Sequence, residues 1–160
     1  MTFFPEEMNP VLLQAAATVS STAATDIIKM SDYHKVTFIV TTGTVGVGGG
    51  ISVRQMDSVS DTVASESRLG IDSYYEKTAA TAAGFTQTSA DSVSSYGGIT
   101  VANADDSKMF VFEVRGDQLD DDNDCVALSF DDSTWNAALV QVTAIGQPRY
   151  RQATPLDMLS

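Results

Sequence analysis

Short runs in which apolar and polar residues alternate recur along the chain, and they constrain its fold more than any other feature. The clearest runs are Met109–Val114, Cys125–Phe130 and Ala137–Ile145. Alternation with a period of two places the apolar side chains on one face of a β-strand. Turns rich in Asp, Ser and Gly separate the runs. The pattern therefore predicts an all-β domain, built as an antiparallel sandwich or barrel.

The phase of the alternation also predicts which side chains face the core. Lys35–Thr42 forms one expected strand and Val45–Met56 continues as a second, with Gly46 and Gly48 to Gly50 between them. We interpret these glycines as a turn or bulge, because no Gly-Lys-Ser or Gly-Lys-Thr follows, as a phosphate loop would require. Only Asn9–Ala17 and Gln118–Asp122 are expected to carry a helical turn. The predicted core residues are Phe38, Val40, Phe110, Phe112, Val126, Leu128 and Val142.

Length and proline placement predict one domain with two arms. A chain of 160 residues, 43% of them hydrophobic, is long enough to bury a core of its own. The four prolines fall near the two ends, where the alternation is weak. We therefore expect a sandwich domain over residues 11–145, an extended N-terminal arm over residues 1–10 and a C-terminal arm over residues 146–160.

The charge balance limits the classes of partner. The chain has 21 Asp and Glu against nine Lys and Arg, a formal net charge of −12. Such a surface repels phosphate backbones, so a nucleic-acid partner is not expected. No apolar run approaches the length of a membrane span, so a membrane partner is not expected either. Cys125 is the single cysteine and sits in a strand-like run. We predict a buried hydrophobe there, with a reactive thiol as the alternative.

Residues that could support catalysis are few. His34 is the single histidine, and no Gly-x-Ser-x-Gly motif is present. We therefore predict a non-enzymatic protein without a cofactor, in which His34 lies in a turn. Asp120, Asp122 and Asp124 have the spacing of calcium ligands, but Cys125 stands where an EF-hand has glycine. A solvated turn is the favoured interpretation, and a looser calcium site is the alternative.

Two further motifs have a functional and a structural interpretation. Arg115-Gly-Asp117 spells an adhesion tripeptide, but it also falls at a strand end where a turn is needed. Trp135 could form a platform for a sugar ring if it shared an exposed face with Tyr74 and Tyr75. The favoured interpretation is that Trp135 packs at the sandwich edge or at a subunit contact.

Four segments of the chain resemble a known class of proteins. They are Met30–Val40, Phe110–Asp120, Val126–Phe130 and Gly146–Tyr150. They follow the patterns (Ser/Asp)-Tyr-(Lys/His)-x-Val-x-Phe, Val-Arg-x-x-x-Leu-Asp and Gly-x-Pro-Arg-Tyr, which are similar to those of small structural proteins of tailed-bacteriophage heads. The resemblance implies a capsid decoration (cement) protein with a jelly-roll sandwich, trimeric on the outside of the head. Its partner would be the major capsid protein, and the particle would assemble in the host cytoplasm.

The two ends carry the predicted interface residues. Aromatic and Arg side chains anchor interfaces more often than other types. The predicted interface residues are Phe3, Phe4, Arg149, Tyr150 and Arg151. The alternative is that both ends pack on their own domain. Two other functions stay open: a tail or head–tail connector component, and a carbohydrate-binding module for attachment.

Overall fold

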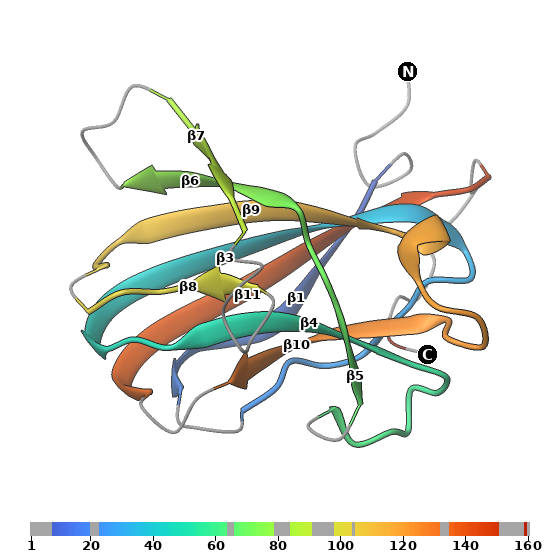
Figure 1. The fold of residues 1–160 in the computed structure, drawn as a ribbon, viewed down its shortest axis with the longest axis horizontal. Helices are drawn as coiled ribbons and strands as arrows, with labels where there is room; N and C mark the ends of the chain where they lie inside the picture. The colour runs from blue at the N-terminus through green and yellow to red at the C-terminus, as the bar shows by residue number, and fades with distance from the viewer. Residues whose placement is uncertain are drawn as a thin grey trace.

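The computed structural model describes residues 8–19, 23–63, 66–78, 84–90, 98–103, 105–131, 135–150 and 159. Within them the chain forms two β-sheets that face each other (Figure 1). Every strand pair in the described part of the chain is antiparallel. The predicted all-β, antiparallel sandwich is therefore confirmed.

Sheet A has six strands in the order β1-β11-β3-β9-β6-β7. Its centre is made of three long strands whose side chains alternate between buried and more exposed positions. The strands are β1 (Asn9–Val19), β3 (Tyr33–Val47), β6 (Ser73–Thr78), β7 (Thr86–Ser89), β9 (Lys108–Arg115) and β11 (Asn136–Pro148).

Sheet B has the order β2-β10-β4-β5, with β8 also pairing with β4. Its two long strands, β4 and β10, pair over seven positions, from Cys125 opposite Met56 to Asp131 opposite Gly50. A short 3-10 helix, η2 (Gly116–Gln118), follows β9 and precedes β10. The strands are β2 (Ile28–Lys29), β4 (Gly50–Met56), β5 (Ser67–Leu69), β8 (Ile99–Thr100) and β10 (Cys125–Asp131).

One hydrophobic core lies between the sheets. The rings of Phe38 in β3 and Phe112 in β9 stack there with centroids 5.3 Å apart, and the two residues are opposite each other in the register. All seven predicted core residues are buried, which confirms the predicted phase of each strand. They are Phe38, Val40, Phe110, Phe112, Val126, Leu128 and Val142.

The glycine run joins the two sheets, and its backbone packs closely against neighbouring residues. Gly48 and Gly49 connect β3 in sheet A to β4 in sheet B. A Cβ on Gly48 would collide with the carbonyl group of Val101, and one on Gly49 would lie 2.5 Å from Nε1 of Trp135. Only residues without a side chain fit both positions. The predicted break between two strands is confirmed only at Gly48 and Gly49, because β3 continues through Gly46 to Val47 and β4 already begins at Gly50. The predicted start of the second strand at Val45 is therefore wrong. No helix begins at these glycines to support a phosphate loop.

Two expectations about local structure change. The predicted helical turn over Asn9–Ala17 is wrong, because these residues belong to β1 and pair with β11. Its Leu-Gln-Ala-Ala-Ala sequence has a high helix propensity, which the long-range pairing overrides. The other helical turn lies at Gly116–Gln118, slightly before the predicted position. The innermost residues of both predicted arms are strand residues, since β1 begins at Asn9 and β11 ends at Pro148.

Candidate binding surface on sheet A

The outer faces of the two sheets differ in exposure. In sheet B, every residue of β4 is buried, including those that point away from the core. There Met56, Cys125 and Ala127 form a second apolar cluster with Val63, and Ile27 packs against it. In sheet A, the outward residues of the long strands are partly or fully exposed. Sheet A therefore presents the larger open surface in the described part of the chain.

A line of mostly apolar side chains crosses the outer face of sheet A. The register places five residues opposite one another on five adjacent strands. Its ends are the most exposed, with Tyr75 at 47% and Leu12 at 53%. Apolar and aromatic side chains are typical of the centre of a protein interface. Charged residues flank the row on the same face, with Glu113 two residues after Val111 and Lys77 two residues after Tyr75. We call this line the outer row: Tyr75, Val111, Ile39, Thr143 and Leu12.

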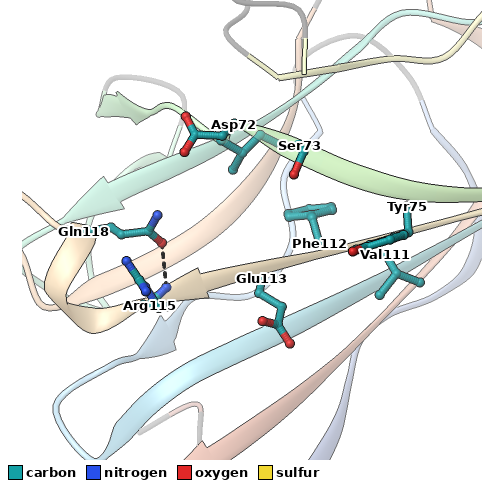
Figure 2. A pocket seen from close by; sticks show the side chains of 9 residues that line it. Asp72, Ser73, Tyr75, Val111, Phe112, Glu113, Arg115 and Gln118 are labelled. Carbon is teal, nitrogen blue, oxygen red and sulfur yellow. Dashed lines mark hydrogen bonds between the residues drawn. The ribbon is translucent and has the colours of Figure 1, made fainter. Parts of the chain in front are cut away.

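A hollow of about 370 Å³ lies at one end of this face, between β6 and β9. Figure 2 shows its side chains, which include Tyr75 and Val111 of the outer row and polar groups at the rim. The backbone N–H of Arg115 donates to Oε1 of Gln118 at 2.9 Å, so η2 is tied to the end of β9. We call it the β6–β9 hollow: Ile71, Asp72, Ser73, Tyr75, Val111, Phe112, Glu113, Arg115 and Gln118.

A second hollow, of about 350 Å³, lies on the other side of Arg115. It takes its cations from three elements: Lys35 from β3, Arg115 from β9 and Arg149 from the residues after β11. Three of the nine Lys and Arg residues of the chain therefore meet in one place. We call it the basic hollow: His34, Lys35, Arg115, Asp117, Gln147 and Arg149.

The cations of the basic hollow are held in different ways. Nζ of Lys35 lies 2.6 Å from Oε1 of Glu113, and Nε of Arg115 lies 3.2 Å from Oδ1 of Asp117. Arg149 instead donates from Nε to the backbone carbonyl of Tyr33 at 3.1 Å. It has no ion-pair partner among the described residues. The guanidinium of Arg149 is thus positioned by the fold without being neutralised by it.

The predicted interface residues fall into two groups. Arg149 lines the basic hollow, and Tyr150 beside it is 77% exposed. Phe3, Phe4 and Arg151 lie outside the described residues. Arg149 is also held against its own domain, since its backbone N–H donates to the carbonyl of Asp32. At Arg149 the C-terminal end therefore packs on its own domain, and the interface role of Arg149 and Tyr150 stays a prediction.

Sequence reasoning missed Lys35 and Arg115 as members of this site. They lie directly opposite each other in the β3–β9 register, and Lys35 is also opposite Gln147 of β11. The sequence does contain a signal for both residues, because each cation lies near one end of a strand whose apolar alternation is clear. Recognising the site would have required the strand order of sheet A, which local patterns do not give.

The acidic turn makes structural contacts with β4. Oδ2 of Asp120 accepts a hydrogen bond from Nε2 of Gln55 at 2.5 Å, and its backbone N–H donates to Oε1 of the same side chain at 2.8 Å. No group of three His, Cys, Asp or Glu side chains in the described ranges is arranged to hold a metal ion. The described contacts favour a turn fastened to β4 through Gln55.

The aromatic trio proposed as a sugar platform does not form one. Trp135 is 4% exposed; its ring meets that of Phe130 edge-on at 5.7 Å and its Nε1 donates to the carbonyl of Gly50. Tyr74 is 8% exposed and packs on Phe110, so only Tyr75 faces solvent. The carbohydrate-platform interpretation is therefore wrong, because side chains of the core face and the outer face alternate in β6.

The remaining sequence candidates have structural surroundings. The prediction that His34 lies in a turn is wrong, because His34 is the second residue of β3. Cys125 is buried, and its burial together with nearby Asp124 raises the pKa of its thiol to about 12. The prediction of a buried hydrophobe is confirmed, since such a thiol is protonated and unreactive at neutral pH. In the part of the chain that the structure describes, no helix is long and apolar enough to cross a membrane.

Comparison with known proteins gives one structural similarity. No family model matches the chain, and no curated protein matches it. A solved structure, the crystal structure of the SPBc2 prophage-derived protein YomS, aligns with a TM-score of 0.46 and 14% sequence identity. The alignment covers 87% of this chain and 91% of that chain.

Proposed function

We propose that this chain is a non-enzymatic structural protein of a phage virion. It binds the outer capsid surface as a decoration, or cement, protein that stabilises the head. The observation that carries the proposal is the open outer face of sheet A, with the outer row across it, opposite a sheet whose outer face is covered. A broad face crossed by a row of uncharged side chains suits docking on another protein. The sequence resemblance to phage head proteins supplies the identity of that protein.

The strand order supports a jelly roll. Numbered consecutively, the strands β1, β2, β3, β4, β8, β9, β10 and β11 run 1-8-3-6 in sheet A and 2-7-4-5 in sheet B. With β5, β6 and β7 left out of the numbering, this nested order supports a jelly roll, an architecture common in viral capsid proteins and also found in lectins and cupins. The architecture alone does not determine function. It is compatible with a capsid-bound role and agrees with the sequence resemblance.

Charge and copy number suit attachment at many sites. A net charge of −12 keeps a protein soluble at the high local concentration of a decorated shell. Many copies on one lattice add their contacts, so each contact can be modest. We propose that the protein is a homotrimer in solution and on the capsid. Light scattering of the purified protein measures this directly, and a monomer at all concentrations would contradict the trimer without affecting the docking proposal.

The number of copies per particle tests the proposed function. A decoration protein follows the capsid lattice, whereas a tail or connector component follows the symmetry of a single ring. We expect quantitative mass spectrometry of purified virions to give copies in proportion to the major capsid protein. We also expect the purified protein to bind undecorated heads and to raise their resistance to heat. A copy number equal to one ring, or no binding to heads, would overturn the proposal.

A further inference from the structure

The basic hollow concentrates positive charge on an otherwise acidic protein. Lys35 and Arg115 reach it from β3 and β9, and Arg149 reaches it from the residues after β11. They are three of only nine Lys and Arg residues against 21 Asp and Glu residues. The walls also contain His34 and Gln147, both exposed hydrogen-bonding side chains. The clustering depends on the fold, because the three cations are far apart in the sequence.

Among the described residues, no hydrogen bond or ion pair uses the terminal nitrogens of Arg149. Its Nε is used by the carbonyl of Tyr33, and the described residues supply no carboxylate to it. Gly116 gives the guanidinium room, because a Cβ there would lie 3.0 Å from Nη2 of Arg149. A planar guanidinium fixed at Nε presents its two terminal nitrogens in the orientation that a carboxylate accepts.

We propose that the basic hollow binds carboxylate side chains of an acidic segment on a partner protein. Charge complementarity selects this occupant, because Arg149 is held in place, no described carboxylate pairs with it, and Lys35 and Arg115 line the same hollow. Glu113 and Asp117, which are paired with these two cations, limit the local positive charge. A small number of carboxylates fits that balance, whereas a nucleic-acid backbone would also meet the acidic surface around the hollow. The inference rests on the proposed function only for naming the capsid as the source of the segment.

The test uses a capped peptide of aspartate residues as the probe and the full chain as the receptor. Isothermal titration at physiological ionic strength is suitable, because the Debye length of about 8 Å screens the distant acidic surface more than contacts inside the hollow. Wild type should bind the aspartate peptide and not an asparagine peptide of the same length. Arg149→Gln should weaken binding about tenfold or more, which corresponds to one charge-assisted contact of about 1.4 kcal/mol.

A matched pair of variants on β11 distinguishes binding in the basic hollow from general electrostatic repulsion of the peptide by the protein. Gln147 lines the hollow and Gln141 does not, although both are exposed on the outer face of the same strand. Gln147→Glu should weaken binding of the aspartate peptide by a factor comparable to that of Arg149→Gln. Gln141→Glu should bind the peptide like wild type. These changes add the same charge and break no hydrogen bond of Arg149. Equal weakening by both variants, equal binding of the asparagine peptide, or no binding by wild type would overturn the proposal.

Binding to undecorated heads separates this inference from the proposed function. If heads bind wild type but lose Arg149→Gln and Gln147→Glu, the acidic segment belongs to the capsid. Equal binding of all variants to heads would overturn the capsid as its source. If heads bind no form of the protein while the aspartate peptide still binds through the hollow, the capsid role fails and the hollow remains a carboxylate site. Tighter binding of a DNA oligonucleotide than of the peptide would overturn the choice of a protein partner.

Discussion

Sheet A and sheet B share one core and differ on their outer faces. On sheet B, outward residues such as Cys125 and Ala127 are as inaccessible as the core itself, because Val63 and Ile27 pack against them. On sheet A, outward residues such as Ile39 and Val111 keep part of their surface in solvent. Both sheets have strands with alternating polarity. Alternation therefore identifies the core face, but it does not tell whether the opposite face is free to bind a partner.

The largest expected difference between the two outer faces is in the cost of placing a cation on each of them. Ala127 is fully buried and lies directly opposite Arg54 in the β10–β4 register. Ala127→Lys should cost about 4 kcal/mol or more, because it buries an unpaired charge beside a like charge. Thr143→Lys on the outer row should change stability by less than about 1 kcal/mol. Urea unfolding measures both, and similar effects for the two variants would show that the faces do not differ.

A second pair of variants compares the two faces of one strand. Phe112 is buried against Phe38, whereas its neighbour Val111 lies in the outer row. Phe112→Ala should lower the free energy of unfolding by about 3–5 kcal/mol, the usual cost for a large core aromatic. Val111→Ala should cost less than about 1.5 kcal/mol, because its side chain is only half-buried. If Phe112→Ala melted like wild type, the register of β9 would be wrong by one residue.

Much of the interior could be predicted from the sequence because each core strand carries its own pattern. The phases of β3, β9, β10 and β11 all follow from local alternation. The fate of β1 could not be predicted this way. Its residues favour a helix by propensity and become a strand only through pairing with residues of β11 that lie 119 to 137 positions later in the chain.

The candidate site was less accessible to prediction than the core. Arg149 was identified from its residue type, but Lys35 and Arg115 join it only because β3 lies between β9 and β11. Trp135 is the opposite case. Its position in a polar loop sequence allowed a role at the surface, but its side chain is buried. Its burial depends on Gly49, whose missing side chain makes room for the indole. Contacts of this kind bring together distant residues and leave no local pattern.

The titration of the Cys125 thiol tests whether the outer face of sheet B is buried. Burial raises its folded-state pKa from 9.0 to about 12, so the unfolded chain loses the proton first as the pH rises. The contribution to stability is therefore constant below pH 9 and falls by about 1.4 kcal/mol per pH unit above it, up to the folded pKa. Cys125→Ala should lack this slope in urea unfolding from about pH 8 to about pH 10.5. Identical slopes, or rapid labelling of the native thiol at neutral pH, would indicate an accessible face.

The most direct test of the docking face is to introduce one carboxylate on it and one elsewhere. Ile39 lies at the centre of the outer row, and Val59 is an exposed apolar residue in the segment after β4. Both Ile39→Glu and Val59→Glu should fold, which melting curves can check. Copies bound per undecorated head are then measured by sedimentation. The account predicts that Ile39→Glu lowers the affinity about tenfold or more, because a carboxylate is desolvated at the interface centre, and that Val59→Glu binds like wild type. Wild-type occupancy of the heads by folded Ile39→Glu would contradict it.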